Sequence, residues 1–341
     1  MKKVLIIQNK ILHYRKPVYN ALANFYDVTI LHSGKESVDM YDRYREIIVP
    51  VKKIGFIYWQ SDVLKIIKSE MYDVIIAMFD LHWVNNLLAV FLEPRKRFIY
   101  WGHRYNQKIG NKLKDLLMRV SDGVILYSDT EIKKMVSRGI SNSKIFVAPN
   151  TIYIPNSSDG SKKYKDSFLF TGRAQKRKKI NQLIKAFSEI FDRIPENIKI
   201  NIVGTGDEND NLKNMADQLG ISDRVVFHGE ILDNDKLMSL FHRAYAYISP
   251  GHVGLGALHS FAYGVPVVTD KNVRHAQEYD NLKHLENSLL FKTYNELKEI
   301  LVTLCNDKHI TARLGKNAYA LYSEDRTLKK MVQGFRDAVD K

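Results

Sequence analysis

A glycine-rich loop is the part of this sequence best suited to bind an anion. Tyr245–Ile248 is a short apolar run that ends at a Ser-Pro pair, which predicts a buried strand. The loop GHVGLG, residues 251–256, follows, and then a short helix to Tyr263. At the start of a helix, backbone N–H groups without an intrahelical acceptor lie at the positive end of the helix dipole. We therefore expect this loop to bind phosphate.

A strongly basic segment follows another predicted strand in the same part of the chain. The strand is Phe168–Phe170, and TGRAQKRKK, residues 171–179, comes directly after it. From the local sequence alone, such a run fits a solvated loop or a nucleic-acid-binding patch as well as it fits a phosphate site. Ligands of α/β proteins bind at the carboxyl ends of strands, however, so this segment and the glycine-rich loop can face one crevice. Arg173 would offer a planar fork of donors, and Lys178 a point charge, to two negative phosphates.

A second glycine turn, VGTGD, occupies residues 203–207. The dinucleotide fingerprint G-x-G-x-x-G requires a third glycine where this chain has Asn209. Gly204 is therefore more typical of a tight turn beside the crevice than of a dinucleotide site. We keep it as a candidate nucleotide contact.

Polar residues also follow two predicted strands in the first half of the chain. His103 comes after the strand at 97–100, where it would face the phosphate site of the second half. A lone histidine is more often structural than catalytic, so position is the only argument for it. A further group comes after the strand at 4–7, at the equivalent end: His13, Tyr14 and Arg15.

Strands and helices alternate regularly along both halves of the chain, which predicts parallel sheets. In the first half we expect strands at 4–7, 28–31, 45–49, 74–78, 97–100, 123–127 and 145–148. The segment 151–166 is polar, has no apolar period and reads as a linker. The fold class is therefore α/β, with two doubly wound, Rossmann-like domains at residues 1–155 and 160–322. The helix at 323–341 could pack back on the first domain.

The composition excludes some classes of protein and leaves others open. A formal net charge of +14 favours anionic partners, which include nucleic acid, anionic lipid and phosphorylated small molecules. Cys305 is the only cysteine, so no disulfide can form within the chain and a reducing compartment is expected. No window resembles a signal peptide or a membrane span. We therefore expect a cytoplasmic protein.

A basic amphipathic helix is predicted at Lys108–Arg119, with Ile109, Leu113, Leu116 and Leu117 roughly on one face. An ordinary surface helix that packs its apolar side on the sheet is the favoured reading. The alternative is a docking surface for anionic lipid at the inner face of the cell membrane. No metal-binding motif is present in the sequence, so phosphate binding here is expected to need no metal and no cofactor.

Three segments of the second half, taken in order, resemble the retaining glycosyltransferases of family 4, which have the two-domain GT-B fold. They are TGRAQKRKKINQLIKAF, IVGTGDENDNLKNMADQLGISDRVVFHGEI and YAYISPGHVGLGALHSFAYGVPVV. The resemblance implies that Arg173 and Lys178 bind the donor diphosphate and assist catalysis, together with the backbone of Gly254 and Leu255. It also implies that Ile231 contacts the base.

In the first half, the resemblance is looser. It places His103 beside the donor sugar, as a catalytic residue. The group of His13, Tyr14 and Arg15 is expected on the acceptor side.

The sequence departs from this family at two positions. The family usually has two glutamates eight residues apart around the glycine-rich loop, one for the donor sugar and one for the ribose. This chain has Gly251 and His259 there. We expect His259 to contact the ribose, and His252 or Gly251 to lie at the donor sugar.

The function that follows is transfer of a sugar from a nucleotide-diphosphate sugar, with retention of configuration. The acceptor would be a glycan or a polyprenyl-diphosphate-linked glycan, as in capsule or O-antigen assembly. A nucleotide-sugar 2-epimerase of the same architecture is an alternative, but the cleft loops show no convincing carboxylate pair. A nucleic-acid-binding protein is another, although no aromatic residue for base stacking lies beside residues 171–179.

Overall fold

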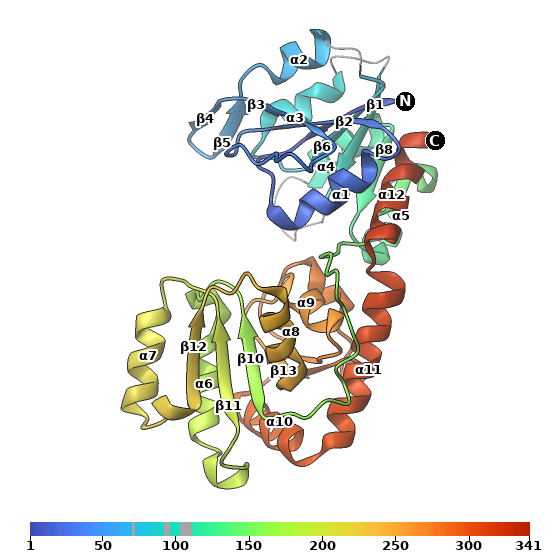
Figure 1. The fold of residues 1–341 in the computed structure, drawn as a ribbon. Coiled ribbons are helices and arrows are strands. Elements are labelled where there is room, and N and C mark those ends of the chain that lie inside the picture. The colour runs from blue at the N-terminus through green and yellow to red at the C-terminus, as the bar shows by residue number, and fades with distance from the viewer. Residues whose placement is uncertain (70–71, 92–95, 103–110) are drawn as a thin grey trace. The chain divides into compact units, whose positions relative to one another are not determined.

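The structure, a computed structural model, describes residues 1–69, 72–91, 96–102 and 111–341. The chain divides into two compact units, one formed by residues 1–153 and 327–341 and the other by residues 154–326 (Figure 1). The chain therefore leaves the first unit after Tyr153 and returns to it at Thr327. We expected these boundaries near residues 155 and 323.

The first unit contains a parallel sheet of seven strands in the order β3-β2-β1-β6-β7-β8-β9. Five of the strands, β1, β2, β6, β7 and β8, consist largely of buried apolar residues, as expected for a sheet covered on both faces. The strands are β1 (Lys3–Ile7), β2 (Asp27–His32), β3 (Arg45–Ile48), β6 (Val74–Met78), β7 (Arg97–Trp101), β8 (Gly123–Leu126) and β9 (Ile145–Val147).

Helices cover both faces of this sheet. Side chains of α2 (Val63–Ser69), α3 (Val84–Leu88), α4 (Asn111–Val120) and α5 (Ile132–Ser137) share one apolar core with the sheet. On the opposite face, α1 (Lys16–Leu22) and α12 (Leu328–Asp340) share another. Helix α12 begins at a Thr327 cap, whose Oγ1 accepts a hydrogen bond from the Lys330 amide at 3.1 Å.

Helix α4 does not have the single apolar face that we expected. Leu117 is buried in the core, but Leu113 and Leu116 are 49% and 51% exposed. Apolar side chains thus occur on both sides of the helix. Residues 103–110, which include the predicted start of this helix, lie outside the described residues.

A two-stranded antiparallel hairpin lies between β3 and α2 in the sequence. It consists of β4 (Val51–Ile54) and β5 (Ile57–Gln60), which pair only with each other among the described strands. We did not predict this element.

The second unit contains a parallel sheet of six strands in the order β12-β11-β10-β13-β14-β15. The chain runs outward from β10 to β12 and then returns to add β13, β14 and β15 on the other side. The topological switch point, where α/β sheets usually bind ligands, therefore lies between β10 and β13. The strands are β10 (Ser167–Thr171), β11 (Lys199–Val203), β12 (Val225–Gly229), β13 (Ala244–Ile248), β14 (Val267–Asp270) and β15 (Ser288–Phe291).

The helices of the second unit connect these strands and close the unit. Helix α6 ends at Ser188, and the chain continues as a short 3-10 turn at Phe191–Arg193. No helix in the described ranges has the length and apolar character needed to span a membrane. The helices are α6 (Ile180–Ser188), α7 (Asn209–Gln218), α8 (Asn234–Arg243), α9 (Gly256–Ala262), α10 (Tyr294–Asn306) and α11 (Lys308–Asp325).

Candidate functional site

The loops that follow β10 and β13 are joined by hydrogen bonds at the switch point. The Gly251 amide donates to the Lys178 carbonyl at 2.9 Å, and the His252 amide donates to the Arg177 carbonyl at 2.9 Å. The Lys178 ammonium donates in turn to the His252 carbonyl at 2.6 Å. The structure thus brings the basic segment and the glycine-rich loop together, as the positions of their strands predicted.

Gly251 makes this junction possible because it lacks a side chain. A Cβ atom there would lie 2.1 Å from the Arg177 carbonyl oxygen, far inside contact distance. Its amide bonds to Lys178, and its carbonyl accepts from Thr269 Oγ1 at 3.1 Å. The backbone therefore leaves no room for a glutamate at this position. Both polar groups of Gly251 are in use, so the structure gives no support to the sugar contact that we expected of it.

Burial lowers the pKa of Lys178 to about 8. The nearby Arg177 guanidinium acts in the same direction, and the buried carboxyl of Glu278 acts against both. A lysine in this position has lost part of its hydration without gaining a full counter-charge. An anion bound beside it would favour the charged form.

The glycine-rich loop presents free amides next to this lysine. Within the described residues, the amides of Gly254 and Leu255 donate to no acceptor. The space around Gly254 is open, since an added Cβ would find its nearest atoms at 3.9 Å, in Ala276 and His252. Unpaired N–H groups beside a half-buried cation form a concave site of positive potential.

His275 fixes the loop just before these amides. Its Nδ1 accepts from the Val253 amide at 3.0 Å, and its Nε2 lies 2.7 Å from the Asp270 carbonyl. A carbonyl can only accept, so Nε2 carries the proton and the ring is neutral. The ring also stacks on Tyr279, with centroids 4.2 Å apart. His275 was not among the predicted site residues, although it follows β14 in the same way as the other candidates follow their strands.

The two histidines expected at the donor are half-buried and neutral. Burial lowers the pKa of His252 to about 4, helped by Lys178 and Arg177, and burial lowers the pKa of His259 to about 4. His252 Nδ1 and His259 Nε2 are buried without a hydrogen-bond partner in the described structure. His259 lies on α9 and packs against the Phe241 ring at 4.8 Å.

The remaining donor-side candidates lie on the neighbouring loops of the same sheet edge. Arg173 follows β10 and is exposed, with no side-chain partner in the described structure. Gly204, with φ 117°, donates to the Gly229 carbonyl at 2.6 Å, and a Cβ there would lie 2.2 Å from the Gly172 carbonyl oxygen. Gly204 therefore acts as a packing glycine, and its amide is not available to a phosphate. Ile231 lies after β12 and is half-buried.

The first-unit candidates divide into three cases. His103 lies outside the described residues. His13 is exposed and Tyr14 half-buried on a 3-10 turn at His13–Arg15. Arg15 is buried at 6% exposure; its guanidinium donates to the Tyr127 hydroxyl at 3.0 Å and lies 5.0 Å from the Trp101 ring centroid. Arg15 thus holds the core of the first unit together, and the structure does not favour its expected place on the acceptor side.

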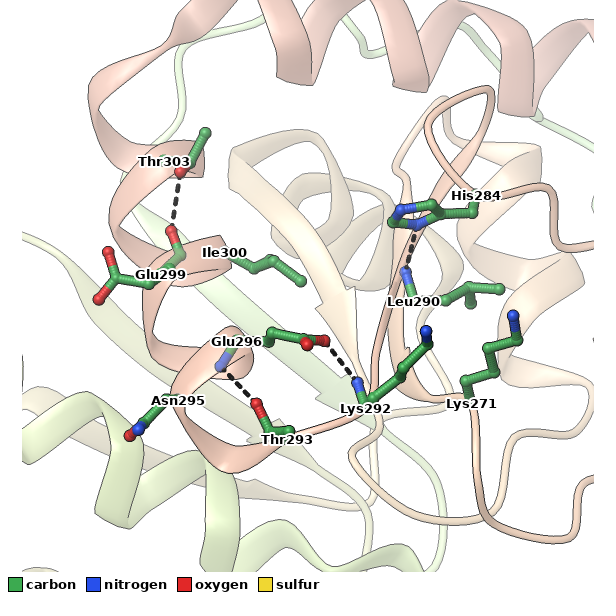
Figure 2. A pocket seen from close by; sticks show the side chains of 10 residues that line it. All are labelled: Lys271, His284, Leu290, Lys292, Thr293, Asn295, Glu296, Glu299, Ile300 and Thr303. Atoms are coloured by element: carbon green, nitrogen blue, oxygen red, sulfur yellow. Dashed lines mark hydrogen bonds between the residues drawn. The ribbon is translucent and has the colours of Figure 1, made fainter.

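A separate pocket of about 640 Å³ lies beside the first turn of α10 (Figure 2). Lys271 and Lys292, which follow β14 and β15, line it together with Glu296 and Glu299. The carboxylate of Glu296 accepts from the Lys292 amide at 2.7 Å. His284 Nδ1 accepts from the Leu290 amide at 3.0 Å, the same type of bond that His275 makes to the glycine-rich loop. Because its cations and carboxylates balance, this pocket is less suited to a diphosphate than the switch point.

No cluster of three or more metal-ligating side chains occurs in the ranges that the structure describes. The groups gathered at the switch point are one ammonium, exposed cations and backbone amides. These are suited to binding the oxygens of an anion directly.

Comparison with known proteins identifies relatives of this part of the chain and of the whole fold. Residues 156–321 match the model of the family Glycosyl transferases group 1. An uncharacterized glycosyltransferase of Methanocaldococcus jannaschii is 30% identical over 181 residues, which are 50% of this chain and 45% of that protein. One of Haemophilus influenzae is 24% identical over 340 residues, 94% of this chain and 93% of that protein. The crystal structure of Anabaena Alr3699/HepE in complex with UDP superposes with a TM-score of 0.73, at 18% identity and with 100% of both chains covered.

These matches confirm two expectations. The fold is α/β with two parallel-sheet domains of the GT-B type, and the expected enzyme class is supported by the relatives, which are glycosyltransferases. The chain spans less than half of the Methanocaldococcus relative but nearly all of the Haemophilus one.

Proposed function

We propose that the protein transfers a sugar from a nucleotide-diphosphate sugar to a hydroxyl of a glycan or polyprenyl-diphosphate-linked acceptor, with retention of anomeric configuration. One observation carries the donor half of the proposal. The half-buried Lys178 ammonium and the free amides of Gly254 and Leu255 lie together at the switch point of a parallel sheet. The UDP bound to HepE, a protein of similar fold, supports a nucleotide diphosphate as the ligand.

The proposed catalytic effect is electrostatic. As the bond between sugar and diphosphate breaks, negative charge grows on the departing phosphate oxygens. Lys178, the loop amides and Arg173 would stabilise that charge more strongly in the transition state than in the ground state, which lowers the barrier. Retention would follow if the acceptor hydroxyl attacks from the side of the departing phosphate and gives its proton to a phosphate oxygen. This step needs no metal, and chelation should leave turnover unchanged.

Other residues would position the rest of the donor. We propose that the Ile231 backbone contacts the base and that His259 contacts a ribose hydroxyl. His252 would reach the sugar, because its ring lies next to the open space at Gly254. A neutral imidazole can donate one hydrogen bond and accept another, which suits sugar hydroxyls.

The acceptor half of the proposal rests on charge. A net charge of +14 favours an anionic acceptor such as a polyprenyl-diphosphate-linked glycan at the inner face of the membrane. Synthesis of capsule or O-antigen would use such an acceptor.

The decisive test of the donor site is a comparison of Lys178→Ala, Arg173→Ala and the control Lys213→Ala. Lys213 is a surface lysine on α7, over the Phe227 ring. UDP affinity should fall in the first two variants, and kcat should fall about 10²–10³-fold with the matching nucleotide sugar, as when one charge-stabilising donor is lost. The control should behave like the wild type. Wild-type UDP affinity and kcat in Lys178→Ala would refute the proposed site.

A 2-epimerase with the same fold would act on the nucleotide sugar alone. Donor consumption that depends on added acceptor, with the product anomer assigned by NMR, separates the two reactions. Consumption without acceptor and with a changed sugar would instead favour epimerisation.

A further inference from the structure

The β4–β5 hairpin ends in exposed apolar side chains. Ile54 and Phe56 are 68% and 75% exposed at the two-residue turn, where Gly55 adopts a left-handed φ of 60°. A single exposed apolar residue is ordinary on a protein surface. Here two large ones share a turn, and Trp59 on the returning strand is 37% exposed.

The pairing of the two strands shows that Ile54 and Trp59 share one face, and Phe56 lies in the turn that joins the strands. In an antiparallel pair, residues opposite each other point to the same side. One side carries the pairs Lys52–Trp59 and Ile54–Ile57, and the other carries Lys53–Tyr58 and Val51–Gln60. The first side is thus apolar and aromatic, with a lysine at its base.

The second side anchors the hairpin. Gln60 is fully buried, its amide group donates to the Gln8 carbonyl at 2.9 Å, and its backbone exchanges two hydrogen bonds with the Asn85 side chain. The Tyr58 ring stacks on Trp83, with centroids 4.9 Å apart. The base is therefore fixed to the first unit, and the tip cannot fold inward to bury Ile54 and Phe56.

We propose that this hairpin docks the enzyme on an anionic lipid bilayer. Ile54 and Phe56 enter the boundary between headgroups and acyl chains, and Trp59 lies at the headgroup level, where amphipathic aromatic rings are favoured. Lys52 and Lys53 meet the lipid phosphates, and residues 51–60 contain no acidic side chain that would oppose them. This inference rests on the proposed function in one respect: docking on the bilayer would bring the enzyme to a lipid-linked acceptor.

The three tryptophans of the chain provide a local probe of this contact. Trp83 and Trp101 are 9% and 2% exposed, whereas Trp59 is on the free face of the hairpin. The wild-type protein, in its full length, is mixed with vesicles of phosphatidylglycerol and phosphatidylcholine in equal parts. We expect binding in a flotation assay together with a blue shift of Trp59 emission, and both should weaken with phosphatidylcholine alone and at high salt.

Four variants sharpen the test. Phe56→Ser should weaken vesicle binding by at least about tenfold, because a large apolar side chain no longer leaves water. Lys52→Gln with Lys53→Gln should remove the preference for the anionic lipid. Trp59→Phe should bind but lose the emission change. Leu232→Ser, which alters an 84% exposed leucine of the second unit, is the matched control and should bind as the wild type does.

Several results would overturn the proposal. Vesicle binding without a change in Trp59 emission would mean that another surface docks, for example the exposed leucines of α4. No vesicle binding at all, or a change of oligomeric state in Phe56→Ser without lipid, would also refute it. A loss of turnover by Phe56→Ser on a short soluble acceptor would assign the hairpin to acceptor binding instead. UDP binding, measured separately without vesicles, shows whether the proposed function itself has failed.

Discussion

Lys178 shows how burial prepares a side chain for an anion. In the free protein its pKa is about 8, below the ordinary value of 10.5, because the ammonium is partly dehydrated. Below this pKa the lysine is charged and can meet a diphosphate. Above it the lysine must first take up a proton, so UDP affinity should fall by up to about tenfold per pH unit. Calorimetric titration of UDP across this range tests the expectation, and Lys178→Arg should flatten the profile because arginine stays charged.

His275 permits a test of each of its two hydrogen bonds. Asparagine keeps an acceptor near the position of Nδ1, for the Val253 amide, whereas glutamine keeps a donor near Nε2, for the Asp270 carbonyl. If the loop amides must be held in place, His275→Asn should keep UDP affinity within a few-fold, and His275→Gln should lose about tenfold, the scale of one hydrogen bond.

His284→Ala is the matched control for this series. It removes the same kind of bond, to the Leu290 amide, away from the glycine-rich loop. Hydrogen exchange at Val253 adds a readout that does not depend on UDP, since the amide should lose protection in His275→Gln but not in His275→Asn. Equal behaviour of the two variants in both measurements would contradict a positioning role.

At the scale of the element, the strands of the sheets were predictable because they are short apolar runs bounded by turns. The hairpin at 51–60 was not, because β4 is exposed and mixes lysines with apolar residues, and the buried residue of β5 is the polar Gln60, so no apolar period marks the strands. The positions of the loops in the sequence were predictable, but the contacts that the loops make with one another were not. Nothing local in the sequence shows that His275 reaches Val253, or that Gly251 lies against the Arg177 carbonyl, because both contacts arise only when neighbouring strands align.

The junction between the β10 and β13 loops makes a prediction about stability. Gly251→Ala places a methyl group where the Arg177 carbonyl oxygen now lies, so the two loops must separate. We expect a loss of about 1–3 kcal/mol in the free energy of unfolding, as for other overpacked sites. Gly254→Ala enters open space and should change the free energy of unfolding little. Denaturant titration of both variants is the measurement, and equal stability would show that the junction is easily deformed.

At the scale of the whole molecule, the chain passes from the first unit to the second and back again. Helix α12 contributes Met331, Phe335 and Ala338 to the core of the first unit, and the Phe335 ring lies 4.8 Å from that of Trp101. Phe335→Ala should cost the first unit about 3–5 kcal/mol. Unfolding followed by Trp101 fluorescence should shift to lower denaturant, while a probe in the second unit should not. A parallel shift of both probes would mean that the two units unfold together.

The return of the chain to the first unit at α12 affects when that unit can complete its fold during translation. Domains of most nascent proteins fold in the order in which they emerge from the ribosome. Here one face of the sheet of the first unit is covered by α1 but not by α12 until the chain has been translated beyond Arg326. The first unit is thus the first to be synthesised, but its core is completed only after the second unit has been synthesised.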